Sequence, residues 1–391
     1  MSTSVKYFHS AMSGAPTLNG VAGSLIAVLD ACLVDGLGLK SADSVVVSGG
    51  TATATFSTGH SFEPDVIALV AGATPSGLNG EKRVLTTTTY TITFAATSIA
   101  DGAATGAITV KLAPAGWAKA FSGTNLAAYR SQDVTGTRLF LRVDDTGTTN
   151  ACVVGYESMS DVNTGLRGFP LPTQVAGGGY WPKANAANAT ARAWTVIADT
   201  KTVWVHLHTA TSGIGASGCV WGFGDFDSYK SGDPYACALQ CSYTDTATAT
   251  AANAAAAEYI GIGATAGPFV ARSFTALGGS TACYHIAESH FSTSGVSGSF
   301  ANNQAPVYPN GPNNGLILAR KVIVEPGIAL RGIQRGLAFP PQNCHGSFNW
   351  RDKIDGQGDY AGRKLMAVKC GSPAGTASQG VVFVDITGPW A

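Results

Sequence analysis

The sequence predicts a mainly β, multi-domain protein with sandwich- or barrel-like sheets and a short helix near the N-terminus. Three observations lead to this prediction. Many short segments alternate apolar and polar residues, clusters of Gly, Asn and Ser separate them, and a helical repeat occurs early in the chain. At 391 residues the chain is long enough for two or three domains, taking about 100 to 200 residues for each.

A short amphipathic helix is predicted between Ser24 and Leu33, where apolar residues recur at helical spacing. Ser24 is the expected N-cap, and Gly36 lies just past the end. The preceding residues 14–20 are rich in turn formers. We interpret residues 1–40 as an arm and helix that dock on another part of an assembly. The alternative is that the helix covers its own domain.

Residues 41–115 are predicted to form a small β-domain, bounded by Pro114 and Gly116. Gly-rich turns separate its expected strands, which is typical of a small sandwich or barrel. The expected strands are residues 44–47, 51–56, 66–70, 90–94 and 107–111.

Residues 116–391 are predicted to form a larger β-rich domain with long loops. Loops as long as residues 292–315 are usually functional or held by partners. The low-complexity tract 245–257 is expected to be a short helix or a loop. The expected strands are residues 137–143, 193–197, 202–208, 215–223, 316–319, 322–324, 365–369 and 381–386.

The charge pattern argues against several classes of partner. The chain has 24 basic and 24 acidic residues, so no net charge attracts it to nucleic acid or to an anionic membrane. Charged residues make up 12%, where about 25% is usual, which favours a subunit whose faces are covered by neighbours. We expect a protein made in the cytosol, because we see no signal peptide and no apolar run of about 20 residues.

The cysteines and histidines offer a weak case for a metal site. His206 and His208 share one face of an expected strand. None of the candidate ligands has the paired spacing of a zinc site, so structural roles are the preferred interpretation. The other candidates are Cys237, Cys241, Cys283, His285, His290, Cys344 and His345. With Cys32, Cys152, Cys219 and Cys370 the cysteines number eight, and we expect most to be buried free thiols.

Three pairs of carboxylates are candidates for acid–base chemistry on sugars: Asp144 with Asp145, Asp225 with Asp227, and Asp352 with Asp355. All three lie in turn-like contexts, where Asp commonly caps its own backbone, and this is the preferred interpretation.

Other catalytic motifs are incomplete. The segments 295–299 and 278–280 lack the spacing and the following helix of a serine nucleophile. The glycine run 177–179 leads into Tyr180 and Trp181 and not into a phosphate-binding helix. Aromatic residues could stack on carbohydrate, but in a β-rich protein they more often fill the core. They are Tyr180, Trp181, Trp204, Trp221, Phe223 and Trp350.

Several phrases together resemble a family of structural proteins of tailed bacteriophages. They begin with residues 6–10, 14–16, 24–33 and 121–127 and extend to the last residues of the chain. The further phrases are residues 141–150, 155–159, 362–366 and 383–390.

This resemblance implies a virion protein that is assembled in the host cytoplasm with other virion proteins, most readily as a homo-oligomer. We expect a non-enzymatic subunit on the exterior of the tail, neck or baseplate, without catalytic, cofactor-binding or metal-binding residues. Capsid decoration and a receptor- or glycan-binding tail module are the alternatives. The high cysteine number suggests a further hypothesis, that disulfides between neighbouring subunits harden the particle.

Overall fold

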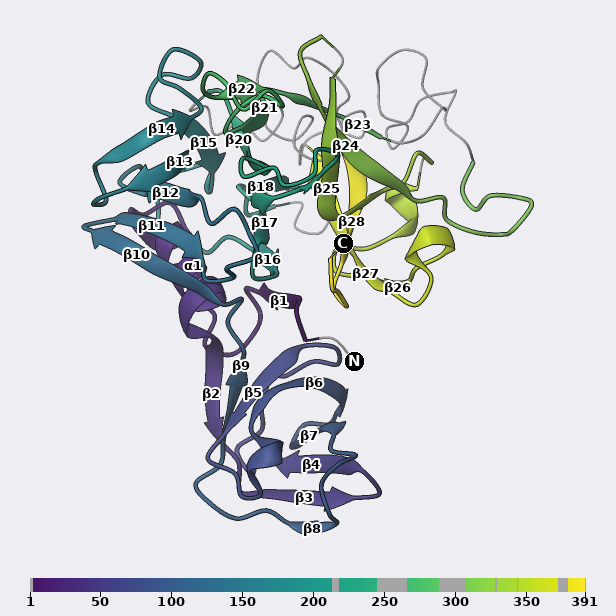
Figure 1. Cartoon of the computed structure of the whole chain (residues 1–391). Coiled ribbons are helices and arrows are strands. Elements are labelled where there is room, and N and C mark those ends of the chain that lie inside the picture. The colour runs from purple at the N-terminus through teal and green to yellow at the C-terminus, as the bar shows by residue number, and fades with distance from the viewer. Residues whose placement is uncertain are drawn as a thin grey trace.

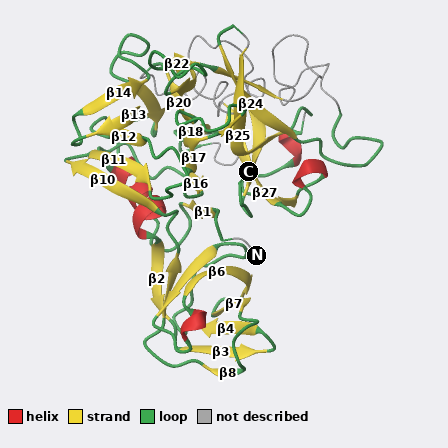
Figure 2. Ribbon diagram, in the orientation of Figure 1, coloured by secondary structure: helices red, strands yellow, loops and turns green. Residues whose placement is uncertain are grey.

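The computed structural model describes residues 3–212, 218–244, 266–287, 307–327, 329–342, 344–371 and 379–390. This part of the chain is mainly β, as predicted, and its strands form curled sheets with few helical turns (Figure 2). Neighbouring strands are antiparallel in all three sheets. One sheet forms a narrow projection below the wider body that holds the other two (Figure 1).

The projecting sheet has eight described strands in the order β2-β9-β5-β6-β7-β4-β3-β8. Buried residues alternate with exposed ones in β3 and with half-buried ones in β4, because one face packs on the core and the other faces outward. The strands are β2 (Leu37–Ser41), β3 (Ser44–Ser48), β4 (Thr51–Thr55), β5 (Ile67–Ala71), β6 (Gly80–Thr87), β7 (Thr91–Ala95), β8 (Gly102–Ala103) and β9 (Thr109–Leu112), with a 3-10 turn η2 (Ser76–Leu78).

The largest sheet has thirteen described strands. Ten of them follow the order β1-β16-β17-β18-β20-β15-β13-β12-β11-β10, and β14, β21 and β22 pair beside this path. The strands are β1 (Lys6–His9), β10 (Trp117–Gly123), β11 (Leu126–Ser131), β12 (Phe140–Asp144), β13 (Asn150–Met159), β14 (Gly165–Phe169), β15 (Gly179–Pro182), β16 (Trp194–Ala198), β17 (Thr202–Leu207), β18 (Cys219–Asp225), β20 (Cys237–Ser242), β21 (Ala266–Val270) and β22 (Thr281–Ala282).

The C-terminal sheet has seven described strands in the order β23-β24-β25-β28-β27-β26, and β19 pairs with β25. The strands are β19 (Asp227–Ser228), β23 (Tyr284–Ala287), β24 (Ala319–Glu325), β25 (Ala329–Phe339), β26 (Lys353–Asp355), β27 (Lys364–Gly371) and β28 (Gln379–Asp385), with 3-10 turns η4 (His345–Ser347) and η5 (Gly358–Tyr360).

The predicted helix is present as α1 (Ser24–Leu29), which continues into a π-helical turn, η1 (Asp30–Asp35). Its apolar side chains Leu25, Val28, Leu29, Cys32 and Leu33 are fully buried in the core of their own chain. Strand β1 of the same segment pairs with β16. The helix therefore covers its own fold, the second of the two alternatives that the sequence left open.

The helix ends as expected but begins differently. Gly36 follows the last turn with φ of 80° and donates its amide hydrogen to Ala31 O. The expectation that Ser24 is the N-cap is wrong, because its hydroxyl donates to Asn19 O at 2.8 Å. The first turn is capped instead by Asp145, whose Oδ2 accepts the amide hydrogens of Leu25 at 2.8 Å and Ile26 at 3.2 Å.

Tryptophans fill the core of the wider body. Trp117, Trp181, Trp194, Trp204 and Trp221 are all fully buried. Most donate the indole N–H to a backbone carbonyl, which removes the penalty of burying a polar group. The bond from Trp204 to Arg335 O, at 3.0 Å, joins β17 to β25 and so ties the two large sheets together.

Polar side chains join the projecting sheet to the wider body. Arg83 on β6 is buried and donates to Ile386 O and to Thr387 O, at 3.4 and 3.0 Å. Lys353 on β26 donates to the hydroxyl of Tyr7 on β1 at 2.6 Å, and both side chains donate to Pro64 O, in the loop before β5 of the projection, at 2.7 Å. These bonds connect the N-terminal strand, the projection and the end of the chain.

Some expected strands begin or end elsewhere. Residues 137–139 form a loop before β12, since Arg138 has φ of 57°, which a strand does not accommodate. Residues 316–318 precede β24 without strand structure. The tract 245–257, residues 215–217 and most of the loop 292–315 lie outside the described residues. The sequence interpretation missed β1, β2, β6, β8, β10, β11, β13, β14, β15, β19, β20, β21, β22, β23, β25 and β26.

Candidate functional site

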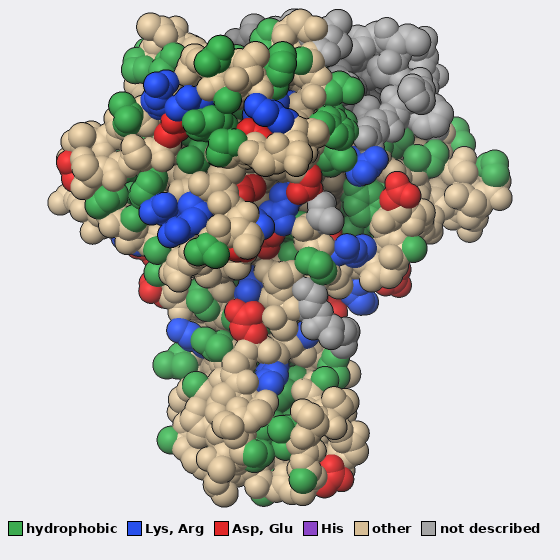
Figure 3. Space-filling view, in the orientation of Figure 1, with side chains coloured by type: hydrophobic (Ala, Val, Ile, Leu, Met, Phe, Trp, Pro, Cys, Tyr) green, Lys and Arg blue, Asp and Glu red, His purple; other side chains and the backbone are tan. Residues whose placement is uncertain are grey.

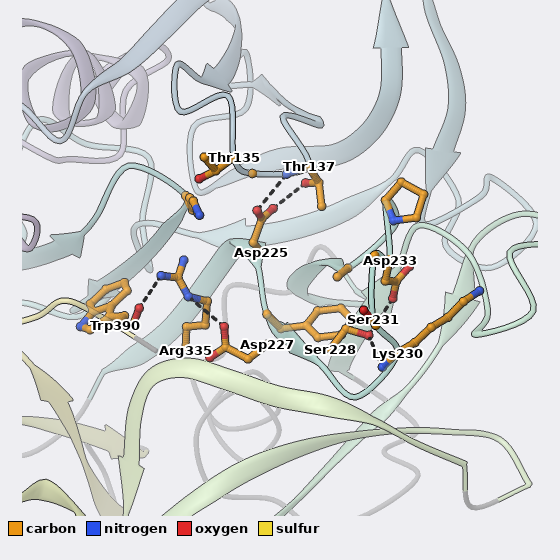
Figure 4. A pocket seen from close by; sticks show the side chains of 16 residues that line it. Thr135, Thr137, Asp225, Asp227, Ser228, Lys230, Ser231, Asp233, Arg335 and Trp390 are labelled. Atoms are coloured by element: carbon orange, nitrogen blue, oxygen red, sulfur yellow. Dashed lines mark hydrogen bonds and ion pairs between the residues drawn. The ribbon is translucent and has the colours of Figure 1, made fainter.

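A groove of about 620 Å³ lies where the two large sheets meet (Figure 4). Its wall is formed by the loop before β12, the end of β18, the loop between β19 and β20, and single residues of β25 and the C-terminal segment. The lining residues are Thr135, Gly136, Thr137, Lys201, Asp225, Phe226, Asp227, Ser228, Lys230, Ser231, Gly232, Asp233, Pro234, Ala236, Arg335 and Trp390.

Asp225, one member of a predicted carboxylate pair, lies at the end of β18 and faces the loop before β12. Its carboxylate accepts the amide hydrogen of Thr137 at 2.9 Å and the hydroxyl of the same residue at 2.5 Å (Figure 4). Burial raises the pKa of Asp225 above its ordinary value, although the bonds from Thr137 oppose the shift. Asp225 thus fastens a loop to the sheet.

Asp227, the second member of that pair, lines the same groove on β19. Its Oδ1 lies 3.4 Å from Nε of Arg335 on β25, whose guanidinium also donates to Trp390 O at 2.7 Å. Oδ2 of Asp227 is buried without a hydrogen-bond partner. Burial and the neighbouring Asp199 raise the pKa of Asp227, while Arg335 opposes them.

Asp233 lines the groove from the loop between β19 and β20. It forms a buried ion pair with Arg331 and accepts the hydroxyl hydrogen of Ser228 at 2.8 Å. Arg331 also contacts Glu325, with Nε and Oε1 2.8 Å apart. Burial alone would raise the pKa of Asp233, but the hydrogen bonds from Arg331 and Ser228 outweigh it, so the pKa lies below its ordinary value.

The other two carboxylate pairs lie elsewhere and have structural partners. Asp145 is fully buried against Lys183 and caps α1. Asp144 accepts from the hydroxyl of Thr146 at 2.7 Å, as expected of a turn residue. Asp352 accepts the amide hydrogen of Asn349 at 2.6 Å, and the exposed Asp355 lies 3.8 Å from Lys364.

His206 and His208 are neighbours, as their shared strand face predicted. Their ring centroids are 4.5 Å apart, and His208 also packs against Trp350 at 4.6 Å. His206 Nε2 bonds to Lys369 O at 2.6 Å, whereas both ring nitrogens of His208 are buried without a partner. Burial lowers the pKa of His206 to about 4, and burial with the nearby charges of His206 and Arg351 lowers that of His208 to about 2.

The remaining candidate metal ligands are not gathered around these histidines. His285 is buried on β23 beside Gln240, 2.8 Å from its amide nitrogen. Burial and the charge of Lys321 lower the pKa of His285 to about 3. Among the described residues, no group of three or more His, Cys, Asp or Glu side chains is placed to hold a metal ion. His290 lies outside them.

No disulfide joins any of the eight cysteines, all of which lie in the described part of the chain, and seven of them are buried. Cys152 on β13 is half-buried and lines a second cavity, of about 500 Å³, with Asp144 and Tyr180. Burial and the nearby Asp144 raise the pKa of the Cys152 thiol to about 11, which leaves little thiolate at neutral pH.

The aromatic candidates do not form an exposed platform. Trp181, Trp204, Trp221 and Phe223 are buried in the core, and Tyr180 and Trp350 are half-buried. The glycine run 177–179 leads into β15 and not into a helix. The loop 278–280 precedes the short strand β22, and residues 295–299 lie outside the described part.

The sequence interpretation missed Thr137, Asp233, Arg335 and Trp390 as residues of the groove, and Arg331 as the ion-pair partner of Asp233. The two arginines lie four residues apart on β25, so they share one face of that strand. Their spacing within residues 329–339 was the available signal, but the strand itself was not recognised.

Comparison of the chain with protein-family models, with curated proteins and with solved structures found no match. In the part of the chain that the structure describes, no helix has the length and apolar character needed to span a bilayer.

Proposed function

We propose that the chain is a non-enzymatic structural subunit of a tailed-phage virion, on the exterior of the tail, neck or baseplate. The observation that carries the non-enzymatic part is that each carboxylate of the three candidate pairs has a hydrogen bond or ion pair with a structural partner. The place in a virion rests on the resemblance of the sequence to phage structural proteins, which extends over nearly the whole chain.

The distribution of charge supports this proposal. Basic and acidic side chains are few and interspersed on the face that Figure 3 shows, and large areas carry neither. A free monomer with so little surface charge tends to associate, whereas a subunit in a particle is covered by neighbours. We therefore propose that the chain forms a homo-oligomer and contacts other virion proteins.

Exposed apolar side chains at the edge of the largest sheet suggest one contact surface. Leu166 on β14 is 63% exposed and Leu277 is 74% exposed. The two lie near each other, because Arg167 donates to Gly278 O at 3.0 Å. We call Leu166 and Leu277 the β14 patch. Clustered exposed apolar residues mark protein interfaces, so this patch is the proposed contact with a neighbouring subunit.

Capsid decoration is the nearest alternative, because a decorating subunit has the same need for covered faces. A receptor- or glycan-binding tail module is the other alternative, although the aromatic residues named from the sequence do not form its platform.

Mass spectrometry of purified particles of the phage that encodes the chain tests the proposal. We expect mass spectrometry to find the chain in a stoichiometric amount relative to known tail or neck proteins. Immunogold labelling with an antibody against the chain should mark the outside of intact particles. Absence of the chain from particles that are free of host protein would contradict the proposal. Labelling spread over the head would favour capsid decoration.

A further inference from the structure

An amine and a carboxyl group meet inside the wider body, closed off from solvent. Lys183 follows the end of β15 and Asp145 follows the end of β12, two strands that both pair with β13 (Figure 1). Both side chains are 0% exposed, and Nζ of Lys183 is in direct contact with Oδ1 of Asp145. The two residues are 38 positions apart in the chain, so it is the fold that brings them together.

The backbone holds both groups in place. Lys183 donates its amide hydrogen to Thr149 O at 2.9 Å, and Asp145 donates its own to Asn125 O at 2.9 Å. Nζ of Lys183 also donates to Val21 O at 2.8 Å. Groups that are held in contact react far faster than the same groups free in solution, because no further ordering is needed.

Burial favours the uncharged form of each partner. It raises the pKa of Asp145 and lowers the pKa of Lys183, although the attraction between the two charges opposes both shifts. An ion pair that is taken out of water carries a desolvation cost, and the passage of one proton from Nζ to Oδ1 removes both charges. The result is a neutral amine, which is a nucleophile, beside a carboxylic acid.

The second carboxyl oxygen lies where developing charge is stabilised. Oδ2 of Asp145 accepts the amide hydrogens of Leu25 at 2.8 Å and Ile26 at 3.2 Å. When an amine attacks a carboxyl carbon, negative charge develops on this oxygen, and two amide donors stabilise it. The contacts that cap α1 therefore also suit the formation of an amide.

We propose that Lys183 and Asp145 join spontaneously in an isopeptide bond. Nζ attacks Cγ of the protonated carboxyl group, and a proton then passes from Nζ to Oδ1, which leaves as water. The Nζ–Cγ bond forms, the Cγ–Oδ1 bond breaks, and no atom is oxidised or reduced. Both proton transfers run between atoms that are already in contact, so no further acid or base takes part. Until the bond forms, the two residues act as an ion pair.

The amide fits the same surroundings. Its oxygen, the former Oδ2, keeps the hydrogen bonds from Leu25 and Ile26, and its remaining N–H bonds to Val21 O. A neutral, hydrogen-bonded amide carries a smaller desolvation cost than two buried charges. The link closes a loop between residues 145 and 183 and so restricts the unfolded chain. This modification goes beyond the proposed function and does not depend on where in a particle the subunit lies.

Mass spectrometry tests the proposal on the purified full-length chain, incubated near neutral pH until its mass is constant. We expect an intact mass below that of the sequence by one water, once any processing of the N-terminus has been identified. Trypsin should not cleave after Lys183, because acylation removes the charge of that side chain. Fragment spectra should show a branched peptide joined through Lys183 and Asp145.

Two variants show which pair carries the link. Lys183→Arg keeps a positive charge but supplies no free amine, so its mass should include the water. Lys119→Met is the matched control, because it removes a separate pair with Asp30 whose side chains are 26% and 24% exposed; it should still lose one water.

Circular dichroism confirms that each variant is folded before masses are compared. If Lys183→Arg does not fold, the fragment spectra of the unmodified chain decide the result. The proposal is overturned if the unmodified chain retains the water, if the loss maps to other residues, or if folded Lys183→Arg loses one water as well.

Discussion

Three buried histidines make the fold sensitive to acid. His206 lies on β17, His208 follows the end of that strand, and His285 lies on β23; all three are almost completely buried. The pKa values of about 4, 2 and 3 in the folded chain lie below the ordinary value of 6.5. The rings are therefore neutral in the folded chain, whereas in the unfolded chain they take up protons as the pH falls below about 6.5.

The magnitude follows from these pKa values. Above about pH 6.5 the rings are neutral in both states and do not lower the free energy of unfolding. Below about pH 6.5 the unfolded state binds protons that the folded state does not, and the free energy of unfolding falls. The ordinary pKa of 6.5 lies about 1.5 units above pH 5, so at that pH each ring lowers the free energy of unfolding by about 2 kcal/mol, at 1.36 kcal/mol per unit. Three rings together remove about 6 kcal/mol, a large part of the roughly 5 to 15 kcal/mol that stabilises a typical fold.

Some carboxyl groups act in the opposite direction. Burial raises the pKa values of Asp145, Asp225, Asp227 and Glu325, so protonation of these groups stabilises the folded chain as the pH falls. A variant that removes one histidine separates the two effects, because the carboxyl groups are the same in both proteins.

Urea unfolding of the unmodified chain and of His208→Phe, at about pH 7 and pH 5, measures the histidine contribution. His208→Phe replaces a ring whose nitrogens have no partners. We expect it to reduce the loss of unfolding free energy between the two pH values by about 2 kcal/mol. His60→Phe, at a half-buried ring in the loop between β4 and β5, is the control and should reduce it far less. Equal stability of the unmodified chain at both pH values, or an unchanged loss in His208→Phe, would refute the reasoning.

Further predictions concern the helix cap, the half-buried thiol and the β14 patch. Lys183→Met leaves a buried carboxylate without its partner and should lower the unfolding free energy by about 3 to 5 kcal/mol, measured by urea unfolding. Lys119→Met breaks a more exposed pair and should lower it by about 1 kcal/mol or less; equal losses would contradict this account. Iodoacetamide should alkylate Cys152 before the buried thiols. If a disulfide joins subunits in intact particles, it should disappear in Cys152→Ser. Monomer alone on a non-reducing gel of intact particles would remove the disulfide hypothesis. Leu277→Glu should prevent oligomerisation in sedimentation experiments while Val134→Glu, at an exposed apolar residue outside the patch, should not, and assembly of both variants would exclude the patch.

The sequence predicted the parts of the fold that local patterns determine. The β-branched run of β17 and the alternating residues of β3 and β4 identify strands, because their side chains fill one face of a sheet. β25 was missed since Gly332, Gly336 and two arginines interrupt its apolar pattern. Those arginines are buried only because acidic residues of other elements pair with them, and local periodicity does not encode that pairing.

The candidate site was predictable only in part for the same reason. Asp225 and Asp227 were recognised as a pair because they lie two residues apart, and both line the groove. Thr137, Arg335 and Trp390 come from distant parts of the chain and meet there through folding. Likewise, Ser24 has the residue type of an N-cap, but Asp145, 120 residues from Leu25 in the chain, occupies that role.

A cryo-electron map of the intact particle, with the chain located by its side chains, tests the central claim most directly. The account predicts rings of this subunit on the outside of the tail, neck or baseplate, with the β14 patch in contact with a neighbouring subunit. A particle whose density is fully assigned to other proteins would contradict it.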